Sequence, residues 1–361
     1  MFLGLINLII VFLTILTSFF LSFGQDSYQV IKKPILIENK AIYITAYTAG
    51  NKARRQDLVN LIKETELNSI VIDIKDYSGL IFFNTGIELA KEIKAENIRI
   101  PDLKEWLTEL KKEGVYTIAR ITIFQDPYLA EKKPEIALKS KEGGIWRDYK
   151  GLAWVDPTHK IVWKYNLDLA KEAVKIGFDE VNFDYIRFPS DGNIRQIVYA
   201  DLQDESSFGK SEVMAEFYKY INEALRFEPV ITSADLFGMV MWRSDGLNIG
   251  QRLEDALHNF DYVCPMVYPS HYPKGFEGFA NPAEHPYEII YRSLIKPSEI
   301  LANSRAKIRP WLQAFNLGAV YTPEMIRKQI QATYDGGGYG WILWNASNRY
   351  TVGGLEKAEN L

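Results

Sequence analysis

The sequence is most informative at Gly177-Phe-Asp-Glu-Val-Asn-Phe-Asp-Tyr-Ile-Arg-Phe-Pro189. Side chains alternate between the two faces of a strand, so Val181 and Phe183 share one face and Asn182 and Asp184 share the other. The apolar pair is suited to packing against helices, which predicts that the polar pair faces the inside of a barrel. A carboxylate in that position needs a partner or a function.

This stretch is the fourth of eight strand signals, each a short run rich in β-branched or aromatic residues. The predicted strands are Ala41–Tyr47, Ser69–Asp76, Val115–Phe124, Phe178–Phe188, Pro229–Phe237, Phe260–Tyr268, Ile308–Phe315 and Tyr339–Ala346. The predicted helices between them are Arg54–Glu66, Pro101–Glu113, Lys160–Ile176, Ser211–Phe227, Asn248–Asn259, Pro286–Lys296 and Pro323–Tyr334. This alternation, without a linker-like break, predicts an α/β fold with a single (β/α)8 TIM barrel. A doubly wound sheet is the alternative.

Two long segments, 125–158 and 191–209, follow the third and fourth predicted strands. Both mix turn-forming and charged residues, and we expect them to be loops over the barrel mouth. In this architecture the functional face is where strands end and loops begin. Polar residues at the carboxyl ends of strands are therefore the candidates for a site.

Two carboxylates end neighbouring predicted strands, Asp184 on the fourth and Asp235 on the fifth. Such a pair suits glycoside hydrolysis, in which one group attacks or stabilises the anomeric carbon and the other protonates the leaving oxygen. We therefore predict that Asp184 and Asp235 are catalytic. A structural ion pair of Asp184 with Arg187, and a helix N-cap role for Asp235, are the alternatives.

The second predicted strand contributes Asp73 and Lys75, with Asp76 at its end. By alternation Asp73 and Lys75 face inward together, either as a salt bridge in the barrel floor or as a pair that binds sugar.

Further polar and aromatic residues near strand ends are candidates for sugar binding, because amides and charged groups hydrogen-bond hydroxyls and aromatic faces stack on sugar rings. With the three residues of the second strand, they complete the predicted substrate-binding set: Asn182, Arg187, Tyr268, His271, Gln313, Trp344 and Asn345.

Composition excludes several other functions. A formal charge of −4 gives no bulk electrostatic case for nucleic acid, which requires a basic face. The only cysteine is Cys264, and the four histidines have no metal-ligand spacing, so we predict no metal and no cofactor. The expected partner is a carbohydrate polymer or oligosaccharide.

Residues 2–23 contain no charged side chain and are long enough to span a bilayer. We predict that residues 1–25 are a signal peptide or a membrane anchor, with a buried core helix as the alternative. Residues 28–361 then form the barrel domain, located outside the cytoplasm, and contact the membrane only through the N-terminal segment.

Six motifs carry a resemblance to a known family. They are Tyr43-Ile-Thr-Ala-Tyr47, Val71-Ile-Asp-Ile-Lys-Asp76, Trp154-Val-Asp-Pro157, the stretch 177–189, Ser233-Ala-Asp-Leu-Phe-Gly238 and Pro265-Met-Val-Tyr268. From about residue 41 to 353 the chain resembles the bacterial family labelled "putative glycosyl hydrolase domain". The resemblance implies a glycosidase-type barrel related to polysaccharide-active families.

Two better-known groups of barrels help to assign roles. Chitinase-type barrels end their fourth-strand motif on a catalytic Glu, and the matching position here is Ile186. Barrels similar to α-amylases place a nucleophile on strand four and an acid on strand five, which Asp184 and Asp235 match by strand, although the usual acid is Glu. Glu180 and Glu254 are fallback carboxylates.

The sequence therefore predicts a glycoside hydrolase that acts on an envelope or extracellular polysaccharide. One alternative is a carbohydrate-binding barrel without catalysis. Another is an enzyme for a phosphorylated metabolite, which would need backbone N–H groups of Gly336-Gly-Gly-Tyr-Gly340 to point into the pocket.

Overall fold

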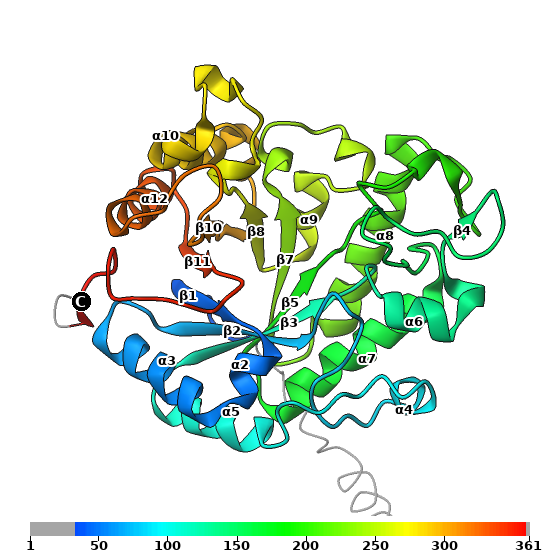
Figure 1. The fold of residues 1–361 in the computed structure, drawn as a ribbon, viewed down its shortest axis with the longest axis horizontal. Coiled ribbons are helices and arrows are strands. Elements are labelled where there is room, and N and C mark those ends of the chain that lie inside the picture. Colours follow the sequence, from blue (N-terminus) through cyan, green and yellow to red (C-terminus); the bar gives the residue numbers. More distant parts are fainter. Residues whose placement is uncertain (1–32, 359–361) are drawn as a thin grey trace, which may run out of the picture. The chain divides into compact units, whose positions relative to one another are not determined.

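Parallel strands form a closed barrel surrounded by helices in the computed structural model, which describes residues 33–358 (Figure 1). The predicted (β/α)8 fold is thereby confirmed. The predicted leader lies outside the described residues. Within residues 33–358, none of the helices has both the length and the apolar character needed to cross a membrane.

All eight predicted strands are present, most of them shorter at their ends than predicted. They are β1 (Asn39–Ile44), β2 (Ser69–Lys75), β3 (Tyr116–Thr122), β5 (Glu180–Asp184), β7 (Ile231–Phe237), β8 (Tyr262–Met266), β9 (Lys307–Ile308) with β10 (Trp311–Gln313), and β11 (Gly340–Trp344). β9 and β10 are two pieces of the seventh strand. Pro310, which has no N–H to give to the ladder, lies between them.

The ring runs β11-β1-β2-β3-β5-β7-β8 and returns to β11 through β10. β8 pairs with β9 along one piece of the seventh strand and with β10 at Met266 and Trp311, while β10 pairs with β11. Closure leaves the carboxyl ends of all strands at one mouth.

Helices surround the ring. Those at the predicted positions are α3 (Lys52–Glu64), α5 (Leu103–Lys112), α7 (Lys160–Ile176), α8 (Ser207–Leu225), α9 (Leu253–Asn259), α10 (Pro286–Ile295) and α12 (Pro323–Asp335). The short helices α2 (Ala46–Gly50), α4 (Glu88–Glu92), α6 (Pro127–Lys132) and α11 (Ser298–Leu301) were not predicted. α7 has the predicted bounds because Gly177 ends it with a φ of +110°, a left-handed conformation that favours glycine.

Buried side chains form two separate clusters. The larger one fills the shell between strands and helices. The smaller one fills the barrel interior and consists of Ala41, Tyr43, Val71, Ile118, Ile231, Tyr262, Cys264, Tyr268, Trp311 and Ile342. Cys264 is fully buried there, as a small apolar side chain.

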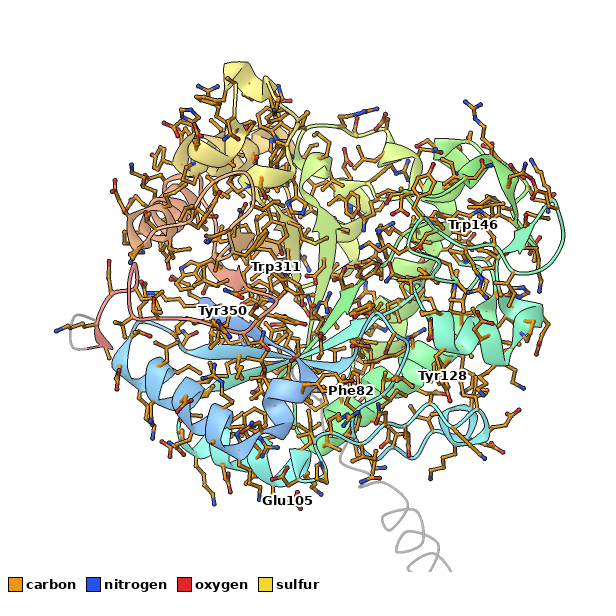
Figure 2. The ribbon with its side chains drawn as sticks, in the orientation of Figure 1. Phe82, Glu105, Tyr128, Trp146, Trp311 and Tyr350 are labelled. Carbon is orange, nitrogen blue, oxygen red and sulfur yellow. The ribbon has the colours of Figure 1, made fainter. Side chains whose placement is uncertain are left out.

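The two long loops are joined to each other by β4 (Lys139–Ser140) and β6 (Ile197–Val198), which form an antiparallel pair. Trp146, labelled in Figure 2, adds a second link, because its Nε1 donates to the carbonyl oxygen of Asn193 at 3.0 Å. The ring of Trp146 also lies against Gly192, where a Cβ would clash and φ is +86°. The two loops therefore form one paired structure.

Candidate active site

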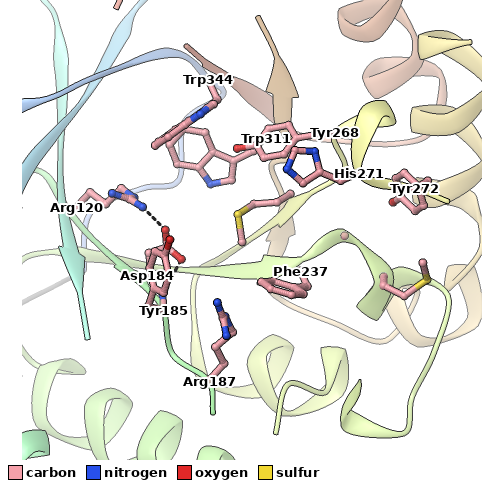
Figure 3. Close-up of a pocket in the computed structure, with 13 residues that line it drawn as sticks. Arg120, Asp184, Tyr185, Arg187, Phe237, Tyr268, His271, Tyr272, Trp311 and Trp344 are labelled. Atoms are coloured by element: carbon pink, nitrogen blue, oxygen red, sulfur yellow. Dashed lines mark hydrogen bonds and ion pairs between the residues drawn. The ribbon is translucent and has the colours of Figure 1, made fainter. Parts of the chain in front are cut away.

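A cavity of about 390 Å³ opens at the carboxyl ends of the strands (Figure 3). The end residues of four strands contribute to its wall, namely Asp184, Phe237, Met266 and Trp344. The complete lining is Arg120, Asp184, Tyr185, Arg187, Phe237, Gly238, Met239, Met266, Tyr268, His271, Tyr272, Trp311 and Trp344. Its place is the one where TIM barrels carry their active sites.

Arg120 of β3, which lines this cavity, connects three carboxylates. Its Nη1 lies 2.7 Å from Asp73 Oδ1, and its Nη2 pairs with Asp184 Oδ2. Its Nε lies 3.7 Å from Asp235 Oδ2. One guanidinium thus faces three acidic side chains from three different strands, so the group has more carboxyls than its single cation can neutralise.

Asp184 is the carboxylate of this group that reaches the cavity wall. Besides Arg120, its Oδ1 accepts the backbone N–H of Tyr185 at 2.5 Å. Tyr185 has a φ of +52°, which is strained for a residue with a Cβ. The chain turns sharply there, so the two partners fix the orientation of Asp184 at the end of its strand.

Asp235 lies deeper, with only 1% of its surface exposed, and it does not line the cavity. Its Oδ1 accepts from Asn182 Nδ2 at 2.8 Å and from Trp311 Nε1 at 2.7 Å. Its Oδ2 has no hydrogen-bond partner within residues 33–358. Burial, reinforced by the negative charge of Asp184, raises the pKa of Asp235 to about 8. This shift favours the protonated form of the carboxyl.

Asp73, the third carboxylate paired with Arg120, is also buried. Its second oxygen accepts a hydrogen bond from the hydroxyl of Tyr43. Burial raises the pKa of Asp73 to about 6, although Arg120 and Tyr43 both oppose the rise.

Aromatic rings form much of the cavity wall. Trp344 stacks on Tyr43 with ring centroids 4.0 Å apart and meets Trp311 edge to face at 5.6 Å. Tyr268 and His271 pack against each other, with ring centroids 5.1 Å apart, and also line the cavity. These flat walls are suited to a ring-shaped ligand.

Five of the predicted site residues are brought together at the cavity, namely Asp184, Arg187, Tyr268, His271 and Trp344. Asn182 and Asp235 lie beneath it, joined by their hydrogen bond. The inward direction predicted for Asn182 and Asp184 from the alternation of the fourth strand agrees with these contacts.

Lys75 does not face inward beside Asp73, and that expectation was wrong. A register shift between Asp73 and Lys75 interrupts the alternation of β2. Lys75 Nζ instead lies 2.8 Å from Asp126 Oδ2 and 3.1 Å from Asn166 Oδ1. The side chain is fully buried on the helix side of the strand, so it is placed to hold the long loop and α7.

Three other predicted binding residues lie outside the cavity lining. Asp76 begins a turn and accepts the backbone N–H of Ser78 at 2.9 Å. Gln313 is fully buried, and its amide oxygen accepts from the backbone N–H of Ser270 at 3.1 Å. Asn345 lines a separate cavity of about 460 Å³ and donates to the carbonyl oxygen of Ala314 at 2.7 Å.

Sequence reasoning did not assign a site role to Arg120, Tyr43 or Trp311. Arg120 had a readable signal, because a charged residue in the middle of an apolar strand needs a buried partner. For Trp311 and Tyr43 the only signal was a position on the inward face of a predicted strand, which many core residues share.

A second acidic group lies deeper in the barrel. Glu180, one of the fallback carboxylates, pairs with Arg309 through both of its oxygens. Ser233 Oγ donates to Glu180 at 2.5 Å and Tyr116 Oη at 3.2 Å. Glu180 and Arg309 are both fully buried, so this carboxylate is committed to structure. Glu254, the other fallback, lies in the first turn of α9.

Within residues 33–358, no group of three or more His, Cys, Asp or Glu side chains is arranged to hold a metal ion. The side chains that line the cavity offer a carboxyl group, two guanidinium groups, an imidazole and aromatic rings. A TIM barrel with carboxylates at the carboxyl ends of neighbouring strands belongs to the architectural class that includes many glycoside hydrolases.

The chain belongs to the family described as "Putative glycosyl hydrolase domain", which it matches over residues 41–350. The family suggested by the sequence motifs is thereby confirmed. No curated protein matches the chain.

Similar solved structures include the following three, of which the two with TM-scores above 0.5 share the barrel fold. A hypothetical protein from Ruminiclostridium thermocellum is 38% identical, over 54% of this chain and 96% of that one, with a TM-score of 0.49. The PgaB (BpsB) glycoside hydrolase domain from Bordetella bronchiseptica is 15% identical, over 86% of this chain and 94% of that one, with a TM-score of 0.62. Alpha-L-fucosidase isoenzyme 2 from Paenibacillus thiaminolyticus is 13% identical, over 86% of this chain and 46% of that one, with a TM-score of 0.57.

Proposed function

We propose that the protein is a glycoside hydrolase that cleaves an envelope or extracellular polysaccharide at the cavity. The observation that carries the proposal is the different state of two neighbouring carboxyl groups. Asp184 is ion-paired at the cavity wall, whereas Asp235 is buried beneath it with its pKa raised to about 8. Two neighbouring carboxyl groups in different environments are typical of glycosidases, in which one acts on the anomeric carbon and the other donates a proton.

The two groups have different roles in this proposal. Asp184 acts on the anomeric carbon, either by attacking it or by stabilising the positive charge that develops there. Asp235 donates a proton to the leaving oxygen, a role that its raised pKa favours. The transfer requires that Asp235 Oδ2, which has no hydrogen bond within residues 33–358, reach the substrate directly or through one water.

The substrate assignment depends on the wall of the cavity and on the predicted leader. Trp344 and Tyr268 offer aromatic surface to sugar rings. The relatives with solved structures include a glycoside hydrolase domain and a fucosidase, which supports a carbohydrate ligand. A leader that is a signal peptide or an anchor would place the barrel outside the cytoplasm, next to envelope and extracellular polymers.

A carbohydrate-binding barrel without catalysis is the second candidate, and one observation favours it. Asp235 is 1% exposed and is not part of the cavity lining, so the proton donor is not in direct contact with the cavity. In this case the aromatic walls bind sugar and the acidic group below them is structural.

The alternative of an enzyme for a phosphorylated metabolite requires free backbone N–H groups in the glycine run at the cavity, and this requirement is not met. Backbone N–H groups of the glycine run are already bonded to α12, Gly336 to Ala332 and Gly338 to Thr333. The run precedes β11, so it lies at the end of the barrel opposite the cavity.

Hydrolysis by the purified protein on a panel of bacterial and plant polysaccharides tests the proposal. We expect Asp184→Asn and Asp235→Asn each to lower turnover by about 100-fold or more while binding persists. Asp57→Asn, an exposed carboxylate on α3, is the matched control and should retain full activity. Binding without turnover in the unaltered protein would favour the second candidate, and turnover that survives Asp184→Asn would contradict the site.

A further inference from the structure

Arg187 is a second arginine at the cavity, and its surroundings differ from those of Arg120. It follows β5 and is 7% exposed, with its guanidinium in the cavity wall (Figure 3). It makes no salt bridge within residues 33–358. Its hydrogen bonds within the described residues all come from Nη1, which donates to the carbonyl oxygen of Phe188 at 3.0 Å and to Ser190 Oγ at 3.2 Å.

Aromatic rings surround this guanidinium and hold its plane. Its central carbon lies 4.7 Å from the ring centroid of Phe237, 5.0 Å from that of Trp154 and 5.2 Å from that of Tyr185. Such contacts stabilise a cation but leave its charge uncompensated. The structure thus holds a buried positive charge beside an open cavity.

The acidic groups nearest to Arg187 are committed elsewhere. Asp148 Oδ1 accepts from the backbone N–H groups of Lys150 and Leu152, and its Oδ2 accepts from Trp154 Nε1. Asp184 is paired with Arg120. Asp191 is exposed, and its Oδ1 accepts the backbone N–H of Tyr149 at 3.3 Å.

The N–H groups of the Arg187 guanidinium that are unpaired among the described residues indicate which kind of ligand could bind beside it in the cavity. With Nη1 bonded to the loop, Nε and Nη2 remain without a partner within residues 33–358. These two donors lie on one edge of the planar group and match the two oxygens of a carboxylate. A sulfate ester presents oxygens in a similar way.

We propose that the cavity binds an acidic sugar residue, whose carboxylate or sulfate group pairs with Nε and Nη2 of Arg187. The proposal depends on the proposed function for the carbohydrate class and adds the charge of the sugar. In this arrangement the sugar ring lies between the aromatic walls, and the anion sets the orientation of the ring relative to Asp184.

Titration of the purified protein with matched pairs of monosaccharides tests this proposal. The pairs are glucuronate with glucose, galacturonate with galactose, and mannuronate with mannose, and galactose 6-sulfate distinguishes a sulfate from a carboxylate. We expect at least one acidic sugar to bind about tenfold more tightly than its neutral partner, because a paired, charge-assisted contact is worth about that factor.

Three variants separate recognition from structural support. Arg187→Gln should remove most of the preference and leave binding of the neutral sugar unchanged, while Arg187→Lys should restore part of it. Arg195→Gln removes the same charge from an exposed position in the neighbouring loop, outside the cavity lining, and should keep the preference.

Several outcomes would overturn the proposal. These are equal binding of all acidic and neutral partners, absence of binding by every acidic sugar, or an Arg187→Gln variant that weakens both members of a pair alike. Because the readout is binding, an acidic preference without hydrolysis of any polymer would contradict the hydrolase and not this inference. Hydrolysis of an acidic polymer that is unaffected by Arg187→Gln would do the reverse.

Discussion

The barrel interior contains two arginine-centred groups, and they differ in their balance of charge. In the deeper one, Arg309 and Glu180 pair one to one, and both side chains are fully buried. In the upper one, Arg120 faces Asp73, Asp184 and Asp235, and Asp184 opens to the cavity.

This difference distinguishes a group that stabilises the barrel from a group that is a candidate for catalysis. In a balanced, closed pair the charge of each group compensates that of the other. An excess of carboxyls around one cation forces protons onto some of them, which is how buried acids come to exchange protons near neutral pH. Pairing alone would not have distinguished the two groups, since arginine and carboxylates occur in both.

The same acid-to-amide change should have opposite effects in the two groups, and the largest effect is expected in the deeper one. Glu180→Gln leaves Arg309 as an uncompensated buried charge, and breaking such a pair costs about 3 to 5 kcal/mol of unfolding free energy. Urea denaturation measures the loss. The double variant Glu180→Gln with Arg309→Met should recover most of it, and a cost of the single change near zero would contradict the assignment.

Asp235→Asn should instead stabilise the protein, by about 2 kcal/mol at pH 7. The pKa of Asp235 is about 8 in the folded state and near 3.8 ordinarily, so between these values the folded protein holds a proton that the unfolded chain has released. The contribution of Asp235 to the free energy of unfolding is therefore most favourable below about pH 4, and it falls as the pH rises toward 8. The amide avoids this loss but gives up the attraction of Arg120 Nε, 3.7 Å away.

Thermal unfolding from pH 4 to pH 8 measures the effect. The advantage of Asp235→Asn should grow with pH across this range. A variant that is less stable than the unaltered protein at pH 7 would show that Asp235 is ionised and held by Arg120.

Proton donation by Asp235 predicts a pH limit for hydrolysis. Above about pH 8 the carboxyl loses its proton, so the rate should fall about tenfold for each further pH unit, which corresponds to about 1.4 kcal/mol. The profile of kcat/KM against pH measures this limb. A rate that stays constant to pH 10 would exclude Asp235 as the acid.

Tyr43→Phe is expected to have the smallest effect. It removes the hydroxyl that donates to Asp73, at a cost of about 1 kcal/mol. Because that hydrogen bond opposes the upward shift, the pKa of Asp73 should rise above its value of about 6. NMR titration of the carboxyl carbon, with Tyr339→Phe as the control, measures the change, and an unchanged or lower pKa would contradict this reading.

Local patterns in the sequence were sufficient to predict the barrel. Each strand is a short apolar run between helical segments, and α7 ends at Gly177 because a glycine is needed there. The seventh strand was also found, although Pro310 divides it into two pieces, a detail that periodicity does not show.

The candidate site could be predicted only where alternation holds. Asp184 lies on the predicted face of an unbroken strand, whereas the register shift in β2 turns Lys75 away from Asp73. Such a shift depends on how neighbouring strands pair, which the sequence of one strand does not contain. Arg120 was missed for a related reason, since its three partners lie on three other strands.

The pairing of β4 with β6 has a consequence for how such barrels can be recombined. The segments after β3 and β5 are separated in sequence by α7, yet they share a ladder and the contact of Trp146 with Gly192. A chimaera that exchanges one segment alone would leave the other without its partner strand. We therefore expect these two insertions to be exchangeable between barrels only as a pair.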